Sequence, residues 1–254
     1  MTRIIINADD FGLNEAATTE IERMIVLGAV SSTTVMANGT QLGEVKRFAI
    51  EHPEISYGVH LCLSEFASVT KSDALYRAGL TDEMGFFIRK AVFGLKNLTD
   101  PIVKNAIRDE LNAQIDIVSS LGFPISHADS HHHVHTIFPL KEVFADVLKE
   151  RGIKKLRLGL DFRSWRSKRH FILWLQREKL NRFYKSNFVT SDAFYSYGEY
   201  LRRSTRKTEM IFELMCHPGH PGQIYRDEMR LVESKAALNN DGIELVTYND
   251  LIKK

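Results

Sequence analysis

The sequence predicts a parallel α/β protein whose strands and helices alternate to form a (β/α) barrel, distorted or incomplete in places. Short apolar stretches of strand composition alternate with stretches of helical periodicity along the whole chain. The 254 residues suit one large domain, spanning 1–254, because α/β barrels often reach this size as a single unit. Titratable side chains gather where predicted strands end, which is where such folds carry their chemistry. A flat doubly wound sheet is the alternative, but no glycine-rich phosphate loop follows the first strand.

Seven strands are predicted from short runs of apolar and β-branched residues. The first contains the continuous run Ile4-Ile5-Ile6, which is typical of a strand buried on both faces. The second is rich in Ser, Thr and Val, and the fourth leads directly into a cluster of histidines. The predicted strands cover residues 3–8, 31–36, 55–61, 123–126, 155–160, 208–216 and 244–246.

Helices are predicted between these strands from apolar periodicity and from residues that begin or end a helix. Asn14 is expected to cap the first helix, and Gly28 to end it. Pro101 begins a long helix that ends before Gly122. The predicted helices cover residues 15–27, 42–51, 101–121, 138–151, 226–239 and the last residues of the chain.

Two segments stand apart from this alternation. Residues 64–100 are irregular, and insertions of this length between barrel units are often lids or substrate loops. Residues 151–185 hold twelve Lys or Arg against two acids, with aromatic residues interleaved. A basic aromatic helix could bind membrane phospholipid or nucleic acid. We favour a solvated helix whose apolar stripe packs on the barrel.

The overall composition indicates a soluble cytoplasmic protein. A net charge of +2 gives no reason to expect nucleic-acid binding by the whole molecule. Cys62 and Cys216 show no pairing pattern, which fits a reducing compartment. The first residues run into a strand without a signal-peptide core, and no apolar run is long enough to span a membrane. Membrane contact is therefore not expected, and a homodimer is left open.

The segment from His127 to His135 holds five of the ten histidines, together with Asp129. Histidine suits both metal binding and proton transfer near neutral pH. A solvated histidine-rich loop would have no need of an aspartate within the run. We therefore expect a functional site at the end of the strand that leads into this segment.

Other predicted strands end in polar groups of the same kind. Asp9 and Asp10 follow the first strand, His60 ends the third, and His217 follows a late strand. Barrel topology brings such ends to one rim, near Asp129 and His131. One carboxylate and two imidazoles with open coordination positions suit a catalytic metal ion. Their ligand types permit zinc, magnesium or manganese.

At this point the sequence resembles a known family, the YdjC-like carbohydrate deacetylases. The matching motifs are Asn7-Ala-Asp-Asp-Phe-Gly12, Gly58-Val-His60-Leu61, His127-Ala-Asp-Ser-His-His-His-Val-His135 and His217-Pro-Gly219. Their order and spacing extend along nearly the whole chain. The family includes chitooligosaccharide deacetylases and hopanoid-biosynthesis-associated members. The resemblance implies a barrel of the glycoside hydrolase/deacetylase type and one divalent metal ion, Mg²⁺ or Zn²⁺.

The resemblance also implies roles for individual residues. Asp10, His60 and His131 are the implied ligands, Asp9 the general base and His217 the general acid. Which of the two adjacent aspartates is the ligand is left open. Four further residues are implied or expected near the substrate or behind the ligands. Arg157 and Asp192 match family positions near the substrate, Asp129 is expected to orient His217 or a ligand histidine, and His133 is expected to contact substrate.

The activity implied is hydrolytic removal of an acetyl group from an N-acetylated amino sugar, as a chitooligosaccharide or a glycolipid-linked sugar. Two alternatives remain open at this stage. A phosphoesterase could use Asp9 and the spare histidines for a second metal ion. A non-catalytic carbohydrate-binding barrel would need neither base nor acid. A glycosidase is disfavoured because it needs two opposed carboxyl groups, whereas histidines dominate this rim.

Overall fold

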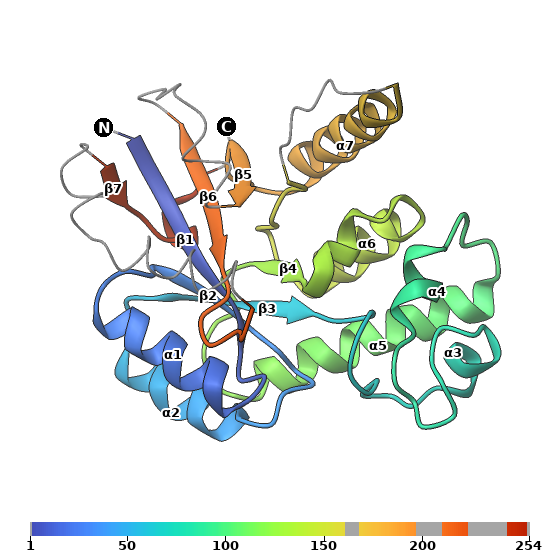
Figure 1. Ribbon diagram of the computed structural model, residues 1–254, viewed down its shortest axis with the longest axis horizontal. Coiled ribbons are helices and arrows are strands. Elements are labelled where there is room, and N and C mark those ends of the chain that lie inside the picture. Colours follow the sequence, from blue (N-terminus) through green and yellow to red (C-terminus); the bar gives the residue numbers. More distant parts are fainter. Residues whose placement is uncertain (1, 161–167, 197–209, 223–242, 253–254) are drawn as a thin grey trace.

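The computed structural model describes residues 2–160, 168–196, 210–222 and 243–252. Its strands form one parallel sheet in the order β4-β3-β2-β1-β6-β5, and β7 pairs with β1. The sheet curls into a half-barrel, so the fold is a distorted (β/α) barrel, as the sequence predicted (Figure 1). The strands are β1 (Thr2–Phe11), β2 (Ser32–Val35), β3 (Ser56–Leu61), β4 (Ala128–Ser130), β5 (Ala193–Ser196), β6 (Ile211–Cys216) and β7 (Ile243–Leu245).

The helices follow the predicted order with small changes at their ends. Asn14 caps α1 by accepting a hydrogen bond from the Ala17 N–H at 2.9 Å. Asp100 caps α5, with Pro101 at the first helical position. The irregular insertion contains two short helices, α3 and α4. The α-helices are α1 (Glu15–Val26), α2 (Leu42–Glu51), α3 (Asp73–Arg77), α4 (Arg89–Phe93), α5 (Pro101–Ser119), α6 (Lys141–Glu150) and α7 (Lys168–Asn187), and the 3₁₀ helices are η1 (His131–Thr136), η2 (Phe138–Leu140) and η3 (Tyr248–Asp250).

Three predicted elements differ from the structure. The fourth strand covers 128–130 instead of 123–126, where Pro124 has no N–H to give to a ladder. Residues 155–160 make only two isolated parallel bridges, Ala128↔Leu156 and Lys155↔Val189. The predicted C-terminal helix is the single 3₁₀ turn η3. The helix predicted for 226–239 lies outside the described residues.

The two faces of β1 explain how the fold positions polar groups. Ile4 and Ile6 belong to the main hydrophobic core, whereas Ile5 packs with Ile211 and Tyr248 in a second, smaller cluster. Strand residues alternate between faces, so Asn7 and Asp9 share the face of Ile5. That face is the interior of the curled sheet. It passes from an apolar end at Ile5 to a charged end at Asp9.

The described part of α7 supports the solvated-helix interpretation of the basic segment. Leu180 and Tyr184 are fully buried against the rest of the protein. Three basic side chains next to them in the sequence are exposed: Lys179, Arg182 and Lys185. Within the described ranges, no helix combines the length and the apolar character that crossing a membrane requires.

Candidate active site

The carboxyl end of β1 separates two neighbouring acids. Asp9 and Asp10 are both buried. The pairing of β1 with β2 shifts register between Ala8 and Phe11, and Asp10 has a left-handed backbone, with φ of 70°. This irregularity turns the two carboxylates toward different partners. Asp9 is bound within a network of buried charges, whereas Asp10 faces two histidines.

Asp10, His60 and His131 meet at one point. The Asp10 Oδ1 lies 3.2 Å from the His60 Nε2 and 2.9 Å from the His131 Nδ1. One ligand atom from each residue falls within 4.8 Å of the others. Burial alone would raise the pKa of Asp10, but hydrogen bonds from the two histidines hold it well below its ordinary value. A bound cation would displace the two ring protons, and the cluster would then offer it one charged oxygen and two imidazole nitrogens.

His60 is oriented from behind by Asp129. The His60 Nδ1 lies 2.6 Å from the Asp129 Oδ1, and the Thr34 hydroxyl donates to the Asp129 Oδ2 at 3.1 Å. Asp129 was expected to orient either His217 or a ligand histidine. The structure places it beside His60, one of the expected ligands. Burial would lower the pKa of His60, but the charges of Asp129 and Asp10 raise it to about 10. The carboxylates of Asp10 and Asp129, one at each ring nitrogen of His60, favour positive charge at this position.

His131 precedes a strained turn, and its ring contacts Glu65, a residue that the sequence did not single out. The two residues after it, His132 and His133, have positive φ of 53° and 55°. The His131 Nε2 lies 3.2 Å from the Glu65 Oε2, so Glu65 can hold the proton at Nε2 when a cation displaces the proton at Nδ1. The signal available in the sequence was an acid shortly after the strand of His60.

Beneath Asp9, Arg157 pairs with three carboxylates. Its guanidinium donates two hydrogen bonds of 2.7 Å to Asp9, and lies 2.6 Å from both Asp129 and Glu213. Burial would raise the pKa of Asp9, but the Arg157 charge lowers it far below its ordinary value. Arg157 is itself completely buried. Of the two expected placements, near the substrate or behind the site residues, the structure shows Arg157 behind Asp9, and its role remains a prediction.

Glu213 was also missed, although an acid inside an apolar strand is a signal of a paired buried charge. It accepts a hydrogen bond from Arg157 at 2.6 Å and from the Tyr248 hydroxyl at 2.5 Å. Burial raises the pKa of Glu213 to about 7. The charge of Arg157 opposes this rise only in part, because Arg157 also pairs with Asp9 and Asp129. Glu213 thus balances the charge on the far side of Arg157.

His217 follows β6 and completes the charged end of the interior. Its Nε2 lies 3.8 Å from the Asp9 Oδ2. Burial lowers the pKa of His217, and the nearby Asp9 charge only partly opposes this effect. A largely neutral imidazole therefore stands beside an ionised carboxylate. The side chain of His217 is 18% exposed, so this edge of the site is accessible.

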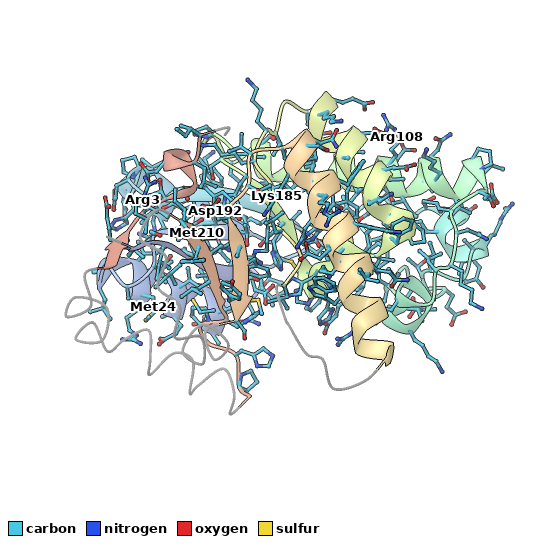
Figure 2. The ribbon with its side chains drawn as sticks, turned by 90° about the horizontal axis from the view of Figure 1, so that it is seen from above. Arg3, Met24, Arg108, Lys185, Asp192 and Met210 are labelled. Atoms are coloured by element: carbon cyan, nitrogen blue, oxygen red, sulfur yellow. The ribbon has the colours of Figure 1, made fainter. Side chains whose placement is uncertain are left out.

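The remaining predicted residues differ in their placement. The His133 ring lies edge-on to Phe194, at 5.5 Å between centroids, and burial lowers its pKa well below the ordinary value. Its contact with substrate remains a prediction. The Asp192 side chain accepts a hydrogen bond from the Ile211 N–H, and Ile211 pairs with Arg3 at the amino ends of β6 and β1. Figure 2 shows Asp192 near Arg3. Asp192 is therefore not brought to the site.

Two other histidines of the His127–His135 segment, His127 and His135, pack within the protein. His127 stacks on Tyr248 with 3.6 Å between ring centroids, and a Cβ at Gly58 would lie 2.5 Å from its ring. The His135 Nδ1 is hydrogen-bonded to the Ser130 hydroxyl. The glycine of the Gly58-Val-His60 motif therefore makes room for a buried histidine.

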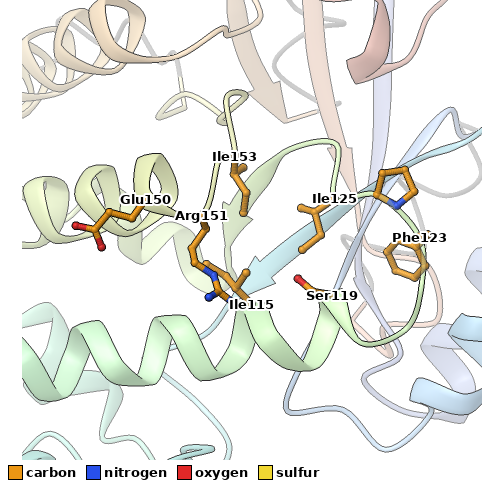
Figure 3. Close-up of a pocket in the computed structure, with 9 residues that line it drawn as sticks. Ile115, Ser119, Phe123, Ile125, Glu150, Arg151 and Ile153 are labelled. Atoms are coloured by element: carbon orange, nitrogen blue, oxygen red, sulfur yellow. The ribbon is translucent and has the colours of Figure 1, made fainter.

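A cavity of about 500 Å³ lies elsewhere, at the amino ends of the strands (Figure 3). It is lined by the carboxyl end of α5 and by the segments that precede β4 and follow α6. Phe123, Glu150 and Arg151 are among the lining residues. None of the predicted site residues contributes to this cavity.

Comparison with known proteins identifies relatives of the whole chain. The family of YdjC-like proteins matches residues 3–244. A chitooligosaccharide deacetylase of Klebsiella pneumoniae is 29% identical over 98% of both chains. A carbohydrate deacetylase of Vibrio parahaemolyticus is 28% identical, over 99% of this chain and 90% of that one. A structure from Enterococcus faecalis described as a cellobiose-phosphate cleavage protein superposes with a TM-score of 0.74 at 24% identity, over 98% of both chains, and shares the fold.

Proposed function

Because the chain belongs to the YdjC-like protein family, we propose that it is a metal-dependent N-deacetylase. Its substrate would be an N-acetylated amino sugar, in an oligosaccharide or linked to a lipid. Relatives with the names carbohydrate deacetylase and chitooligosaccharide deacetylase support this substrate class. The observation that carries the proposal is the meeting of Asp10, His60 and His131 beside Asp9 and His217.

The donor set fits a divalent ion. Asp10 supplies a charged oxygen, and both histidines have a second nitrogen fixed by a carboxylate, Asp129 behind His60 and Glu65 behind His131. Such outer partners select the tautomer that leaves a lone pair for a metal ion. When bound, a zinc or magnesium ion would supply Lewis acidity toward the acetyl carbonyl and toward water. The identity of the ion is not fixed by these ligand types.

Asp9 is suited to act as the general base because Arg157 keeps its carboxylate ionised and fixes its direction. Its Oδ2 would accept a proton from the attacking water. His217, 3.8 Å away and largely neutral, would take up that proton and pass it to the departing amine. An amine leaves readily only when it is protonated. Asp9 and His217 therefore form a proton path from the water to the leaving group.

The phosphoesterase alternative is less well supported. A second metal ion bridged by Asp9 would occupy the space where the Arg157 guanidinium already binds both carboxylate oxygens. A non-catalytic carbohydrate-binding barrel would not explain a base and an acid at this spacing. Release of acetate distinguishes the proposed deacetylase from both alternatives, because each alternative predicts that no acetyl group is released.

The test is mass spectrometry of N-acetylated amino sugars after incubation with the protein and either Zn²⁺ or Mg²⁺. We expect at least one sugar to lose the mass of a single acetyl group, with release of acetate. Chelation should abolish the loss. A panel that includes glucosamine oligosaccharides of several lengths and sugar-lipids would define the substrate. Absence of deacetylation across the panel would contradict the proposal.

A further inference from the structure

Phe66 has a backbone conformation that its side chain disfavours. Its φ is 64°, in the left-handed region that glycine adopts freely and that bulky residues rarely adopt. Residues in such conformations persist only where the surrounding structure imposes them, and they gather at functional sites. Phe66 lies in the loop after β3, the strand that carries His60. The strain is therefore located beside the candidate site.

Hydrogen bonds from three parts of the chain hold this loop in place. The Cys62 thiol donates to the carbonyl of Glu65, and the Phe87 N–H donates to the carbonyl of Phe66 at 2.9 Å. The Asn38 side chain donates to the carbonyl of Ala67 at 2.5 Å. Three consecutive carbonyl groups are thus fixed. The conformation of Phe66 is imposed by its surroundings, and its ring is directed as a consequence.

The ring of Phe66 is partly exposed and lies beside His131, the most exposed residue of the Asp10–His60–His131 cluster. Its centroid is 5.8 Å from that of His131. Within the cluster, the His131 side chain is 12% exposed, against 8% for Asp10 and 2% for His60. The adjacent Glu65 side chain is 50% exposed. His131 is thus the most exposed residue of the cluster, and a substrate that reaches it from this side would pass Glu65 and Phe66.

We propose that Phe66 is a substrate-binding residue that packs against the apolar face of the sugar ring whose acetamido group is hydrolysed. The negatively polarised face of an aromatic ring attracts the C–H groups on one face of a pyranose, and burial of both surfaces adds to the attraction. Glu65, one residue earlier, offers acceptor oxygens at the edge where sugar hydroxyl groups would lie. This inference rests on the proposed deacetylase function.

The test compares Phe66→Gly with Phe66→Tyr on the N-acetylated oligosaccharide that the unmodified protein turns over best. Phe66→Gly should raise KM by about 3- to 10-fold, the range expected for loss of one aromatic packing contact. Because glycine relieves the left-handed strain, its thermal midpoint should not fall. Phe66→Tyr keeps the ring and should retain KM within about twofold. Phe93→Ala, which removes a ring 47% exposed at the end of α4, is the matched control and should leave KM unchanged.

The outcomes separate this inference from the proposed function. An active parent protein with an unchanged KM in Phe66→Gly would overturn the role of Phe66 and leave the deacetylase function standing. A large fall in thermal midpoint in both Phe66 variants would show a structural residue and also overturn it. Absence of deacetylation by the unmodified protein on every sugar would overturn the proposed function, and this inference with it. A KM increase confined to Phe66→Gly would support it.

Discussion

Asp9 and Asp10 are adjacent in the chain and both buried, but their surroundings are opposite. Asp9 accepts hydrogen bonds from Asn7 and twice from Arg157, so a permanent cation already balances its charge. Asp10 faces His60 and His131, whose lone pairs can serve a metal ion as well as a proton. One carboxylate is thus neutralised by the protein itself, and the other is directed toward a site for an added cation.

The difference has a local cause, the irregularity at the end of β1. In a regular strand Asp9 and Asp10 would point to opposite faces, with Asp10 buried in the apolar layer that Ile4 and Ile6 occupy. The left-handed backbone at Asp10 instead brings its carboxylate back to the rim. Aspartate tolerates this conformation better than most residues do. The bulge therefore lets one strand end supply two acids with separate tasks.

The largest expected effect on metal content and activity comes from substitution of Asp10. Asp10→Asn removes the only charged oxygen of the proposed ligand set, so the purified protein should lose its divalent ion and its activity should fall to background. Asp9→Asn should retain the ion. Elemental analysis of both variants, together with kcat/KM, measures the contrast. If Asp9→Asn lost the ion and Asp10→Asn kept it, the two roles would have to be exchanged.

The next largest effect is expected on kcat/KM, from substitution of the proposed base Asp9 and the proposed acid His217. Asp9→Asn and His217→Ala should each lower kcat/KM by about 10²–10⁴-fold with the ion retained, the usual share of general acid–base catalysis. An activated aryl ester expels its leaving group with less help from an acid than an amide does. His217→Ala should therefore recover much of its activity on an aryl acetate, whereas Asp9→Asn should not. Equal losses on ester and amide would remove His217 from the acid role.

Arg157 provides a test of stability under Asp9. Arg157→Met should lower the free energy of unfolding by about 3–5 kcal/mol, because it leaves buried carboxylates without their cation. Arg182→Met, on the exposed side of α7, is the matched control and should change it by less than about 0.5 kcal/mol. Urea unfolding measures both. A loss in Arg157→Met no larger than in the control would show that this network contributes little.

The sequence predicted the barrel and the rim because both depend on short-range patterns. The run Ile4-Ile5-Ile6, the cap Asn14 and the helix-starting Pro101 set element type locally, and parallel topology then brings strand ends together. That logic predicted that Asp10, His60 and His131 would be neighbours. What it could not predict was direction. Which of two adjacent acids faces the histidines depends on a bulge, which no periodicity reveals.

Long-range partners were the other gap. Arg157 was singled out by resemblance alone, and its sequence neighbourhood did not predict that it is fully buried among carboxylates from β1, β4 and β6. Glu65 lies in an insertion without periodicity, so its place shortly after the strand of His60 was the single sequence signal and did not identify His131 as its partner. Asp192 was placed by resemblance alone, and the register of β6 puts it at the opposite end of the barrel.

A smaller effect is expected from the carboxylate behind His131. Glu65→Gln keeps the shape of the side chain but weakens its hold on the Nε2 proton, so the affinity for the divalent ion should fall by about 10-fold. Titration of the metal-free protein measures this directly, without reference to activity. Glu54→Gln is the matched control, because Glu54 pairs with His52 at 3.0 Å away from the cluster. Equal affinities in the two variants would argue against a role for Glu65.

The smallest expected effect is a pH dependence of the free energy of unfolding that arises from Glu213, which Arg157 contacts together with Asp9 and Asp129. Burial raises the pKa of Glu213 from 4.5 to about 7, while Arg157 and the Tyr248 hydroxyl oppose the rise and Asp129 adds to it. A group whose pKa is raised on folding contributes stability that is full below its unfolded pKa and is lost as the pH rises through its folded pKa. The unmodified protein should therefore lose stability between about pH 5 and 7 through this group, at no more than about 1.4 kcal/mol per pH unit.

Glu213→Gln has no proton to lose and should lack this contribution. Histidines whose pKa is lowered by burial, such as His135, act in the opposite sense, since they lose stability as the pH falls. They are present in both proteins, so the difference between the two unfolding curves isolates Glu213. Urea unfolding across this pH range should show the variant gaining on the unmodified protein as the pH rises. A constant difference would mean that Glu213 stays ionised throughout, bound to Arg157 as firmly as Asp9 is.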